Sequence, residues 1–474
     1  MAPTAVSNAS ESAPAPSSKL VSASGLIQVP DSDVAFAPAT EPYQRRLKLT
    51  ESDPRETEIT FPLILKPVRA GDKDEDLTTA QLVEALKPLA PVPSTTYQPS
   101  KLQQLMDAHG GAIHFKGLPV RDAHDFSEFM HALAGTAPPG GDAAGKYNLW
   151  THHVDKGLMV IRHAMAPNVA TANEGPPHQS IGSHNEYGLS THYPSVIAFC
   201  CLSAPTSGGQ TPIVNSLALY DRLKSTTPGY IEKIQRSGLT FIIHHPVAKV
   251  NGSVQGNSLY NADSFGPTPD AEVDLASLSE EQKRKLVEEN ILELAREGGW
   301  GDSTEDGREE DGKYGAWHQR GFSWAWLPDG SINVFQRVPG IRVHPTLQKP
   351  AYFNNVGNRY AYSKEHGCLQ PPHYSEEKKD YFPPPSFPLP PGKEIQTADG
   401  IKQEDETIPL EWLEQAHQWT KELQAHVEWQ QGDILVIDNL AVQHARTPWT
   451  GPRKLVASLW DQRSYLDLNL PLRT

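Results

Sequence analysis

Short strand-like segments, separated by long connections that often contain proline, limit the folds open to this chain more than any other feature. The segments are β-branched or aromatic and are bounded by Gly, Pro or Asn, as strands commonly are. We place them at residues 111–120, 158–163, 195–202, 239–243, 331–334, 433–437 and 454–460. Because a parallel sheet requires helices between successive strands, this pattern favours an antiparallel barrel or sandwich.

Three segments of helical periodicity and one proline-rich segment interrupt this pattern. Apolar side chains recur at helical spacing over 122–133, and two charged amphipathic segments lie at 270–296 and 409–428. Six prolines fall within 381–392, where we expect a packed surface loop; a polyproline ligand for another protein is the alternative. We therefore predict a mainly β fold with flanking helices and with helical and proline-rich insertions.

The first 42 residues differ in composition from the rest of the chain. They are rich in Ala, Ser and Pro and poor in aromatic residues, so they bury too little apolar surface to offset the entropy of ordering. We predict a disordered tail over 1–42 and one folded domain over 43–474. The insertions of this domain are expected around 250–320 and 365–410. The sequence does not indicate an oligomeric state.

Charge and cysteine content disfavour several classes of protein. The net charge is -15, which disfavours binding to nucleic acid or to an anionic membrane. The longest apolar run, Val196–Leu202, is far shorter than the roughly 20 residues of a membrane-spanning helix. The chain has 3 cysteines and no signal-peptide pattern at its start. We therefore expect a cytoplasmic protein that acts on a small molecule.

A His-x-Asp/Glu pattern occurs three times and can indicate a metal site. Residues i and i+2 of an extended strand point to one face, so such a pair can supply two ligands to one ion. The pairs are His153 with Asp155, His184 with Glu186, and His426 with Glu428. With 19 histidines and 57 acidic residues, some matches arise by chance, so the context has to distinguish them.

The context favours His184 and Glu186. His426 ends the helical segment 409–428, where residues two apart lie on different sides. No anion-binding element follows His153. In contrast, a strand follows Glu186 and leads to the segment 205–212, in which two glycines allow close approach of a ligand and Thr211 offers a hydrogen bond.

The best candidate for a third ligand is His444, which follows a buried-type strand and a turn. The chain then reverses over 447–452 and returns at Arg453. Because neighbouring strands lie about 4.8 Å apart, Arg453 can return beside His444. A cation so close to a metal requires an anion between them, which predicts a site for a dianion. Histidines satisfied by hydrogen bonds in an inactive barrel are the alternative.

Together these residues resemble a known family. The elements that carry the likeness are His184-x-Glu186, Gly208-Gly209-x-Thr211, His444 and Arg453. This arrangement is similar to the TauD/TfdA family of iron(II)/2-oxoglutarate-dependent dioxygenases, in particular to its clavaminate synthase-like branch. The likeness extends over about residues 105–465. It implies a double-stranded β-helix, or jelly-roll, barrel.

The resemblance also implies a chemistry for each element. His184, Glu186 and His444 would bind iron(II) as a facial triad. The cosubstrate 2-oxoglutarate would chelate the iron beside a position for O2, while its far carboxylate meets Arg453 and Thr211. The enzyme would then oxidise a C–H bond of a small amino-acid-like or carboxylate metabolite, in secondary metabolism, by hydroxylation, desaturation or ring closure. The cosubstrate would be converted to succinate.

Departures from the family pattern restrict the substrate. Ala457 stands where taurine-type members carry a second arginine, which argues against a sulfonate held in that way. Arg337 and Arg342 are candidates for binding a substrate carboxylate, and structural ion pairs are the alternative. We expect Arg446 to brace the turn after His444, and a shared contact with the cosubstrate is the alternative. The presence of Glu186 argues against a halogenase, in which a small residue replaces the acidic ligand.

Two other functions stay open at this point. A non-catalytic barrel could use its proline-rich loop and N-terminal tail for binding. A zinc hydrolase could use the same three ligands, although hydrolysis gives no role to Arg453 and Thr211.

Overall fold

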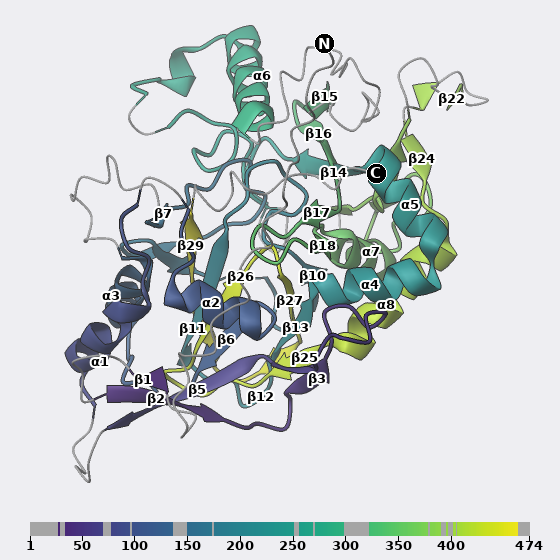
Figure 1. Ribbon diagram of the computed structural model, residues 1–474. Helices are drawn as coiled ribbons and strands as arrows, with labels where there is room; N and C mark the ends of the chain where they lie inside the picture. The colour runs from purple at the N-terminus through teal and green to yellow at the C-terminus, as the bar shows by residue number, and fades with distance from the viewer. Residues whose placement is uncertain are drawn as a thin grey trace, which may run out of the picture.

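A large sheet forms the centre of the molecule (Figure 1). The computed structural model describes residues 27–28, 34–69, 77–94, 97–135, 149–172, 175–250, 256–268, 271–297, 322–377, 380–389, 395–396, 402–403 and 405–462. Across the sheet the strand order is β1 (Ile27–Gln28), β2 (Val34–Ala39), β5 (Leu63–Arg69), β6 (Ala112–Phe115), β26 (Ile434–Asp438), β11 (Val196–Ser203), β29 (Lys454–Asp461), β9 (Val169–Thr171) and β8 (Ala164–Ala166), with β7 (Thr151–His152) also beside β29. Strands β5 and β6 are parallel, whereas β6, β26, β11 and β29 pair antiparallel.

A smaller antiparallel sheet packs against the large one. Its order is β10 (Ile181–His184), β27 (Val442–Arg446), β13 (Thr211–Asn215) and β25 (Ala425–Val427). Side chains of both sheets share one hydrophobic core, to which β11, β26 and β29 contribute from one side and β13, β25 and β27 from the other. The large and small sheets thus form two packed layers, as expected of a mainly β chain.

The sequence of the central strand β11 is apolar almost throughout because both of its faces are buried. Ile197 and Phe199 point into the core shared with the small sheet. Val196 and Ala198 point the other way, into a second core under three helices. These helices are α1 (Thr79–Leu86), α2 (Lys101–Ala108) and α3 (Ala123–Ala134). Because both faces of β11 are buried, alternation with polar residues is lost.

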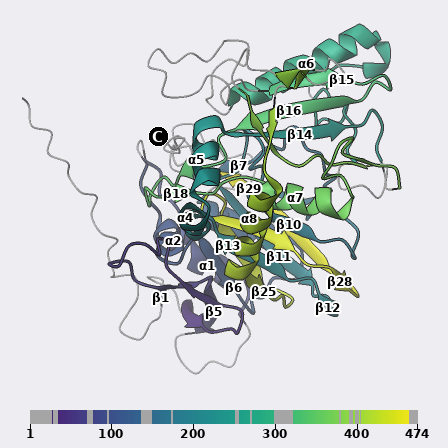
Figure 2. The same cartoon turned by 90° about the vertical axis from the view of Figure 1, so that its right-hand side faces the viewer.

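Further helices surround the small sheet, and a third sheet lies beyond them. A core cluster joins Val214 of the small sheet to α4 (Ser216–Thr226), α5 (Pro228–Ser237), α7 (Val356–Glu365) and α8 (Leu410–Leu423). The third sheet has the order β15 (Phe322–Trp326), β16 (Ile332–Val338), β14 (Leu239–His245), β21 (Ser386–Pro388) and β24 (Asp405–Thr407). Helix α6 (Glu280–Glu297) packs on β15 and β16 at one end of the molecule (Figure 2).

The remaining described elements are short. Two-stranded pairs are formed by β3 (Arg45–Leu47) with β4 (Ile59–Phe61), β12 (Ser207–Gly208) with β28 (Trp449–Thr450), β17 (Arg342–Val343) with β18 (Pro350–Ala351), β19 (Tyr374–Ser375) with β20 (Asp380–Tyr381), and β22 (Ile395–Gln396) with β23 (Lys402–Gln403). The 3₁₀ turns are η2 (Lys87–Leu89) and η3 (Leu275–Ser277). In the described part of the chain, no helix is both long enough and apolar enough to cross a bilayer.

The predicted disordered tail over 1–42 is wrong at its C-terminal end. Strand β2 pairs with β5, and Val34 and Phe36 are buried. Phe36 packs edge-on against Phe115, with ring centres 5.5 Å apart. The alternation Val-Ala-Phe-Ala supplies two apolar side chains on one face, which is enough to join an existing sheet. Residues 1–26 and 29–33 lie outside the described part.

Several other element predictions need correction. Residues 158–163 are not a strand but an irregular segment. The helix expected over 409–428 ends at Leu423, and Ala425–Val427 forms β25, with His426 on its exposed side. The helix expected over 270–296 begins only at Glu280, where the charged repeat starts. The described part of the proline-rich segment, 381–389, is packed as expected, because Phe382 and Phe387 are buried. It is not a loop throughout, since Ser386–Pro388 forms strand β21 of the third sheet.

Candidate active site

Strand pairing brings two of the predicted ligands together. His184 is the last residue of β10, and it lies opposite His444 in the register of β10 with β27. His444 also lies opposite Ile213 of β13, so it occupies the middle of the small sheet. The two imidazole ring centres are 4.3 Å apart.

Glu186 completes a cluster of three. Its Oε2 lies 3.3 Å from His444 Nε2 and 3.8 Å from His184 Nε2. One donor atom from each of the three residues lies within 4.8 Å of the others. Glu186 and His444 are buried and His184 is half-buried, so bulk water competes little for these atoms.

The protonation of the cluster suits a cation. His184 Nδ1 donates to the carbonyl of Gly182 at 2.8 Å, which leaves the Nε2 lone pair directed at the cluster. Burial and the neighbouring His184 lower the pKa of His444 to about 4, so this ring is neutral at pH 7. Two imidazole nitrogens and one carboxylate are a donor set that fits a divalent first-row metal ion.

Arg162 keeps the carboxylate of Glu186 ionised. Its Nη2 donates to Glu186 Oε1 at 2.5 Å, while the other carboxylate oxygen faces the histidines. Burial raises the pKa of Glu186, but Arg162 and the two histidines outweigh burial and hold this pKa well below its usual range. Sequence analysis missed Arg162. The available signal was an arginine that interrupts the apolar run of 158–161.

Two asparagines fix the backbone around Glu186. The side chain of Asn439 accepts from Glu186 N at 2.8 Å and donates to Glu186 O at 2.9 Å. Asn185 in turn donates to the carbonyl of Asn439 at 2.7 Å. Both asparagines are fully buried. They tie the end of β10 to the turn after β26, and thus set the position of Glu186 relative to His444.

One cavity contains the cluster and both residues predicted to bind 2-oxoglutarate. His184, Glu186 and His444 line it together with Thr211 and Arg453. Its empty volume is about 1090 Å³, including the open mouth. Trp429 Nε1 donates to Thr211 Oγ1 at 2.9 Å, so the hydroxyl proton of Thr211 stays available to a ligand.

The glycine-rich turn positions Arg453. The carbonyl of Gly209 accepts from Arg453 Nε at 3.2 Å. Gly209 has a φ of +68°, and an added Cβ would lie 3.1 Å from Arg453 Cδ. Burial and the nearby Arg446 lower the pKa of Arg453 to about 10. Arg453 is half-buried, and two guanidinium groups side by side favour an anion at this end of the cavity.

Arg446 shares an aromatic neighbour with Arg453 and braces the turn as predicted. The Cζ atoms of Arg446 and Arg453 lie 4.6 and 5.0 Å from the ring centre of Trp449. Arg446 donates through Nη2 to the carbonyl of Gln179 at 2.9 Å. Its side chain also lines the cavity, so the bracing contact leaves it next to any ligand.

The other sequence candidates lie elsewhere. Arg337 donates to Ser323 Oγ at 2.8 Å on the third sheet, and Arg342 packs over the ring of Tyr193; neither lines the cavity. His153 pairs with Asp461 at 2.8 Å. Ala457 does line the cavity. Four residues that sequence analysis did not single out also line it: Asn355, Asn358, Arg359 and Tyr362.

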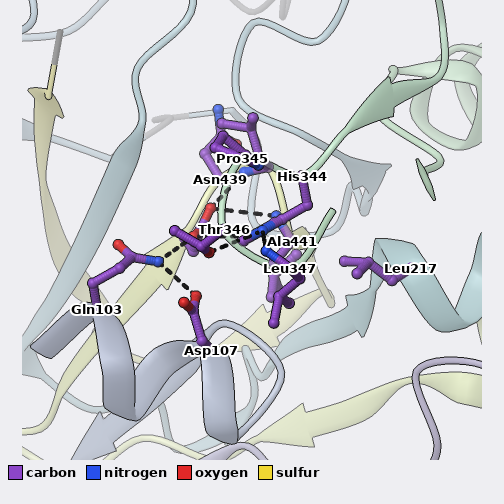
Figure 3. A network of polar contacts seen from close by, with 12 residues as sticks. Gln103, Asp107, Leu217, His344, Pro345, Thr346, Leu347, Asn439 and Ala441 are labelled. Atoms are coloured by element: carbon purple, nitrogen blue, oxygen red, sulfur yellow. Dashed lines mark hydrogen bonds and ion pairs between the residues drawn. The ribbon is translucent and has the colours of Figure 1, made fainter. Parts of the chain in front are cut away.

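A second group of ionisable residues, Asp107, His344 and Asp438, lies within 4.8 Å in the described part of the chain. Leu347 N donates to His344 Nδ1 at 3.2 Å, so the ring proton is on Nε2, which lies 3.2 Å from Asp438. Gln103 bridges the two carboxylates (Figure 3). Because Nε2 carries a proton, this group is a closed hydrogen-bond network between α2 and β26 rather than a metal site.

Comparison with known proteins finds relatives of similar sequence and solved structures of similar fold. A clavaminate synthase-like protein of Arabidopsis thaliana is 24% identical over 401 residues, which cover 84% of this chain and 93% of the relative. The dapdiamide synthesis protein DdaC of Enterobacter agglomerans is 20% identical over 351 residues, which cover 74% of this chain and 82% of the relative. Among solved structures, a taurine dioxygenase from Burkholderia xenovorans aligns with a TM-score of 0.36 at 11% identity, over 89% of this chain and 90% of that one.

A family model covers most of the chain. Residues 84–460 match the model described as taurine catabolism dioxygenase TauD, TfdA family. The matched region contains all three residues of the cluster as well as Thr211 and Arg453. This chain therefore belongs to the TauD/TfdA family of dioxygenases.

Proposed function

We propose that the protein is an iron(II)- and 2-oxoglutarate-dependent oxygenase. One observation carries the proposal: His184, Glu186 and His444 share a cavity with the half-buried Arg453 and with Thr211. A metal-ligand cluster alone would also suit a hydrolase. The cationic end of the cavity gives a reason for a dianionic cosubstrate, which a hydrolase does not need.

In this proposal the three residues of the cluster bind iron(II) through His184 Nε2, His444 Nε2 and Glu186 Oε2. Bound iron(II), with 2-oxoglutarate and O2, supplies the oxidising power to break an unactivated C–H bond, and succinate and CO2 are released. Arg453 pairs with the far carboxylate of 2-oxoglutarate, and Thr211 donates a hydrogen bond to it.

The protein itself orients the ligands and excludes water. Arg162 occupies Glu186 Oε1, which leaves Oε2 for the metal and keeps the carboxylate from binding through both oxygens. Apolar side chains, including Phe199, Leu455 and Phe382, form much of the remaining wall. A wall of this kind protects a reactive centre from bulk solvent.

The fold fits this function as one jelly-roll domain. We interpret the large and small sheets as the two sheets of a double-stranded β-helix. The ordered domain then begins at β2 rather than at residue 43, and α6 with the third sheet belongs to the insertions.

The substrate is proposed to be a small amino-acid-like or carboxylate metabolite. Ala457 lines the cavity at the position of the second arginine of taurine-type members, which disfavours a sulfonate bound in the same way. Hydroxylation, desaturation and ring closure all begin with removal of a hydrogen atom, so each is compatible with the site.

Oxygen-dependent conversion of 2-oxoglutarate to succinate tests the proposal. Iron(II) added to metal-free protein should start this turnover, and zinc should not. Substitution His444→Ala should reduce it at least about 100-fold, because a metal ligand is lost. The exposed His426 on β25 of the same sheet provides a matched control, since His426→Ala should keep wild-type turnover. If His444→Ala keeps its turnover, His444 is not a metal ligand. Hydrolytic activity of the zinc-loaded protein would favour the zinc hydrolase instead.

A further inference from the structure

Helix α7 presents a polar face to the cavity. Its N-cap residue Asn355 and the helical residues Asn358, Arg359 and Tyr362 all line the cavity. The spacing i, i+3, i+4 and i+7 places these side chains on one side of the helix. Gly182 N of β10 donates to Asn358 Oδ1 at 3.0 Å, so this face lies beside the strand that ends in His184.

The cavity holds more arginine than the proposed cosubstrate can neutralise. Among the described residues that line it, Glu186 is the single carboxylate, against four guanidinium groups: Arg162, Arg359, Arg446 and Arg453. Iron(II) and the dianion of 2-oxoglutarate balance each other, so the excess of positive charge stays. A substrate that brings a negative charge would reduce this excess.

Arg359 is suited to receive that charge. Its residue is 4% exposed, and its Cζ lies 5.4 Å from the ring centre of Phe382, which restricts the guanidinium. Burial lowers the pKa of Arg359 to about 10, whereas at Arg162 the carboxylate of Glu186 outweighs burial and raises the pKa. A carboxylate that binds a buried guanidinium through two oxygens offsets much of its desolvation.

Asn355 adds a neutral polar group one helical turn away. It is 5% exposed, and its Oδ1 is buried without a hydrogen-bond partner among the described residues. An added Cβ on Gly188 would lie 2.7 Å from this oxygen, so the glycine leaves room for it. A buried amide oxygen without a partner costs stability, which a ligand N–H or O–H would recover.

We infer that Asn355 and Arg359 form the substrate anchor, in which Arg359 binds a carboxylate and Asn355 Oδ1 accepts from an adjacent ammonium or hydroxyl group. The substrate is then an α-amino or α-hydroxy acid. This inference rests on the proposed function, because 2-oxoglutarate must occupy Arg453 for Arg359 to serve the substrate. In this proposal Arg359 takes the role of binding the substrate carboxylate, which the sequence analysis gave to Arg337 and Arg342.

Binding of defined probes tests the anchor. The probes are the common L-amino acids, their α-hydroxy analogues and, for each, the carboxamide that lacks the carboxylate. Binding is read as a rise in melting temperature of the metal-free protein with 2-oxoglutarate present. A second reading is the change that each probe causes in the visible absorption of the anaerobic complex with iron(II) and 2-oxoglutarate. At least one acid should bind, and its carboxamide should bind roughly 100-fold more weakly.

Three variants and one control test the two residues. Arg359→Gln should weaken the acid roughly 100-fold, and Asn355→Asp should do so as well, because the new carboxylate pairs with Arg359 at i+4. Lys364→Gln removes the same charge from an exposed position of α7 and should bind like wild type. The melting temperature of each unliganded variant separates loss of binding from loss of folding, and Arg359→Lys should retain partial binding.

The possible results distinguish a failure of the substrate anchor from a failure of the proposed function. Wild-type binding of the acid by Arg359→Gln, equal binding of acid and carboxamide, or no binding of any acid to wild type would overturn the anchor. Absence of both the visible band and 2-oxoglutarate turnover in wild type would instead overturn the proposed function.

Discussion

At the scale of the residue, the centre depends on a contact that the spacing of ligands does not reveal. Arg162 and Glu186 are both buried, and the arginine holds the carboxylate oxygen that does not face the histidines. Removing one member of a buried ion pair leaves the other without compensation. Arg162 therefore controls both the charge and the orientation of the proposed metal ligand.

We predict that Arg162→Met weakens iron(II) binding roughly 10- to 100-fold, since partners of metal ligands commonly contribute this much. Anaerobic titration followed by the visible band of the 2-oxoglutarate complex measures the change. Arg222→Met, which breaks the surface pair with Glu51, should bind iron(II) like wild type. An unchanged dissociation constant in Arg162→Met would show that Glu186 is held by the backbone contacts of Asn439 alone.

Sequence reasoning brought together residues on strands or close to strand ends, but it missed residues on an irregular segment and on a helix. His184, Glu186, His444, Thr211 and Arg453 were predicted to meet, and they line one cavity. Their positions follow from strand register, which repeats from protein to protein. Arg162 and Arg359 reach the cavity from an irregular segment and from a helix whose placement depends on tertiary packing. A single sequence does not contain that information.

At the scale of the element, α7 and β10 approach each other closely enough to exclude a side chain. An added Cβ on Gly182 would lie 2.6 Å from Asn358 Cα and 2.9 Å from the carbonyl oxygen of Gly357. Both atoms belong to the helix backbone, so they cannot move without the helix. The close contact places the polar face of α7 and His184 in the same cavity.

We predict that Gly182→Ala lowers the free energy of unfolding by about 1–3 kcal/mol, the usual cost of overpacking. It should also weaken substrate binding, because α7 moves away from β10. Urea denaturation measures the first effect. Gly229→Ala in α5 is the control: its nearest neighbour, Trp412 Cζ2, is 3.7 Å away, so this change should be neutral or stabilising. Equal stability of the two variants would mean that the helix yields easily.

Elements were predicted well where burial is simple. Strands buried on both faces, such as β11, β26 and β29, were located to within one or two residues. The apolar residues at 158–163 were taken for a strand, although several of them line the cavity. An apolar pattern indicates that a segment is buried. It does not distinguish a strand of a sheet from an irregular segment that lines a cavity. The predicted helix extends too far, beyond the end of α8 at Leu423, because Ala425-His-Val fits the helical period of 3.6 residues as well as the strand period of two.

At the scale of the whole molecule, a buried neutral histidine links the third sheet to acid stability. His245 of β14 is fully buried, lies against Phe265 and contacts Ser264 Oγ at 3.2 Å through Nδ1. Burial and the neighbouring His244 lower the pKa of His245 from 6.5 to about 3. Between these values the unfolded chain binds a proton that the folded chain does not, so stability falls as the pH falls.

We predict that this histidine costs the wild type about 1.4 kcal/mol of stability per pH unit below pH 6.5, with the full contribution restored above it. Urea denaturation at pH 7, 6 and 5 should show a shallower decline in His245→Gln than in wild type. The exposed His124 of α3 is the control, since His124→Gln should keep the wild-type slope. Parallel slopes for all three proteins would place the acid sensitivity elsewhere.

The placement of the last strands determines when the protein can assemble during synthesis. Strand β26 lies between β6 and β11, β29 pairs with β11, and β27 lies between β10 and β13. The large sheet therefore lacks β26 and β29, and the small sheet lacks β27, until the C-terminal part of the chain has been synthesised. Until then β6, β11, β10 and β13 lack these partners, and unpaired strand edges of this kind favour aggregation. The cluster of His184, Glu186 and His444 likewise forms only after β27 has paired with β10.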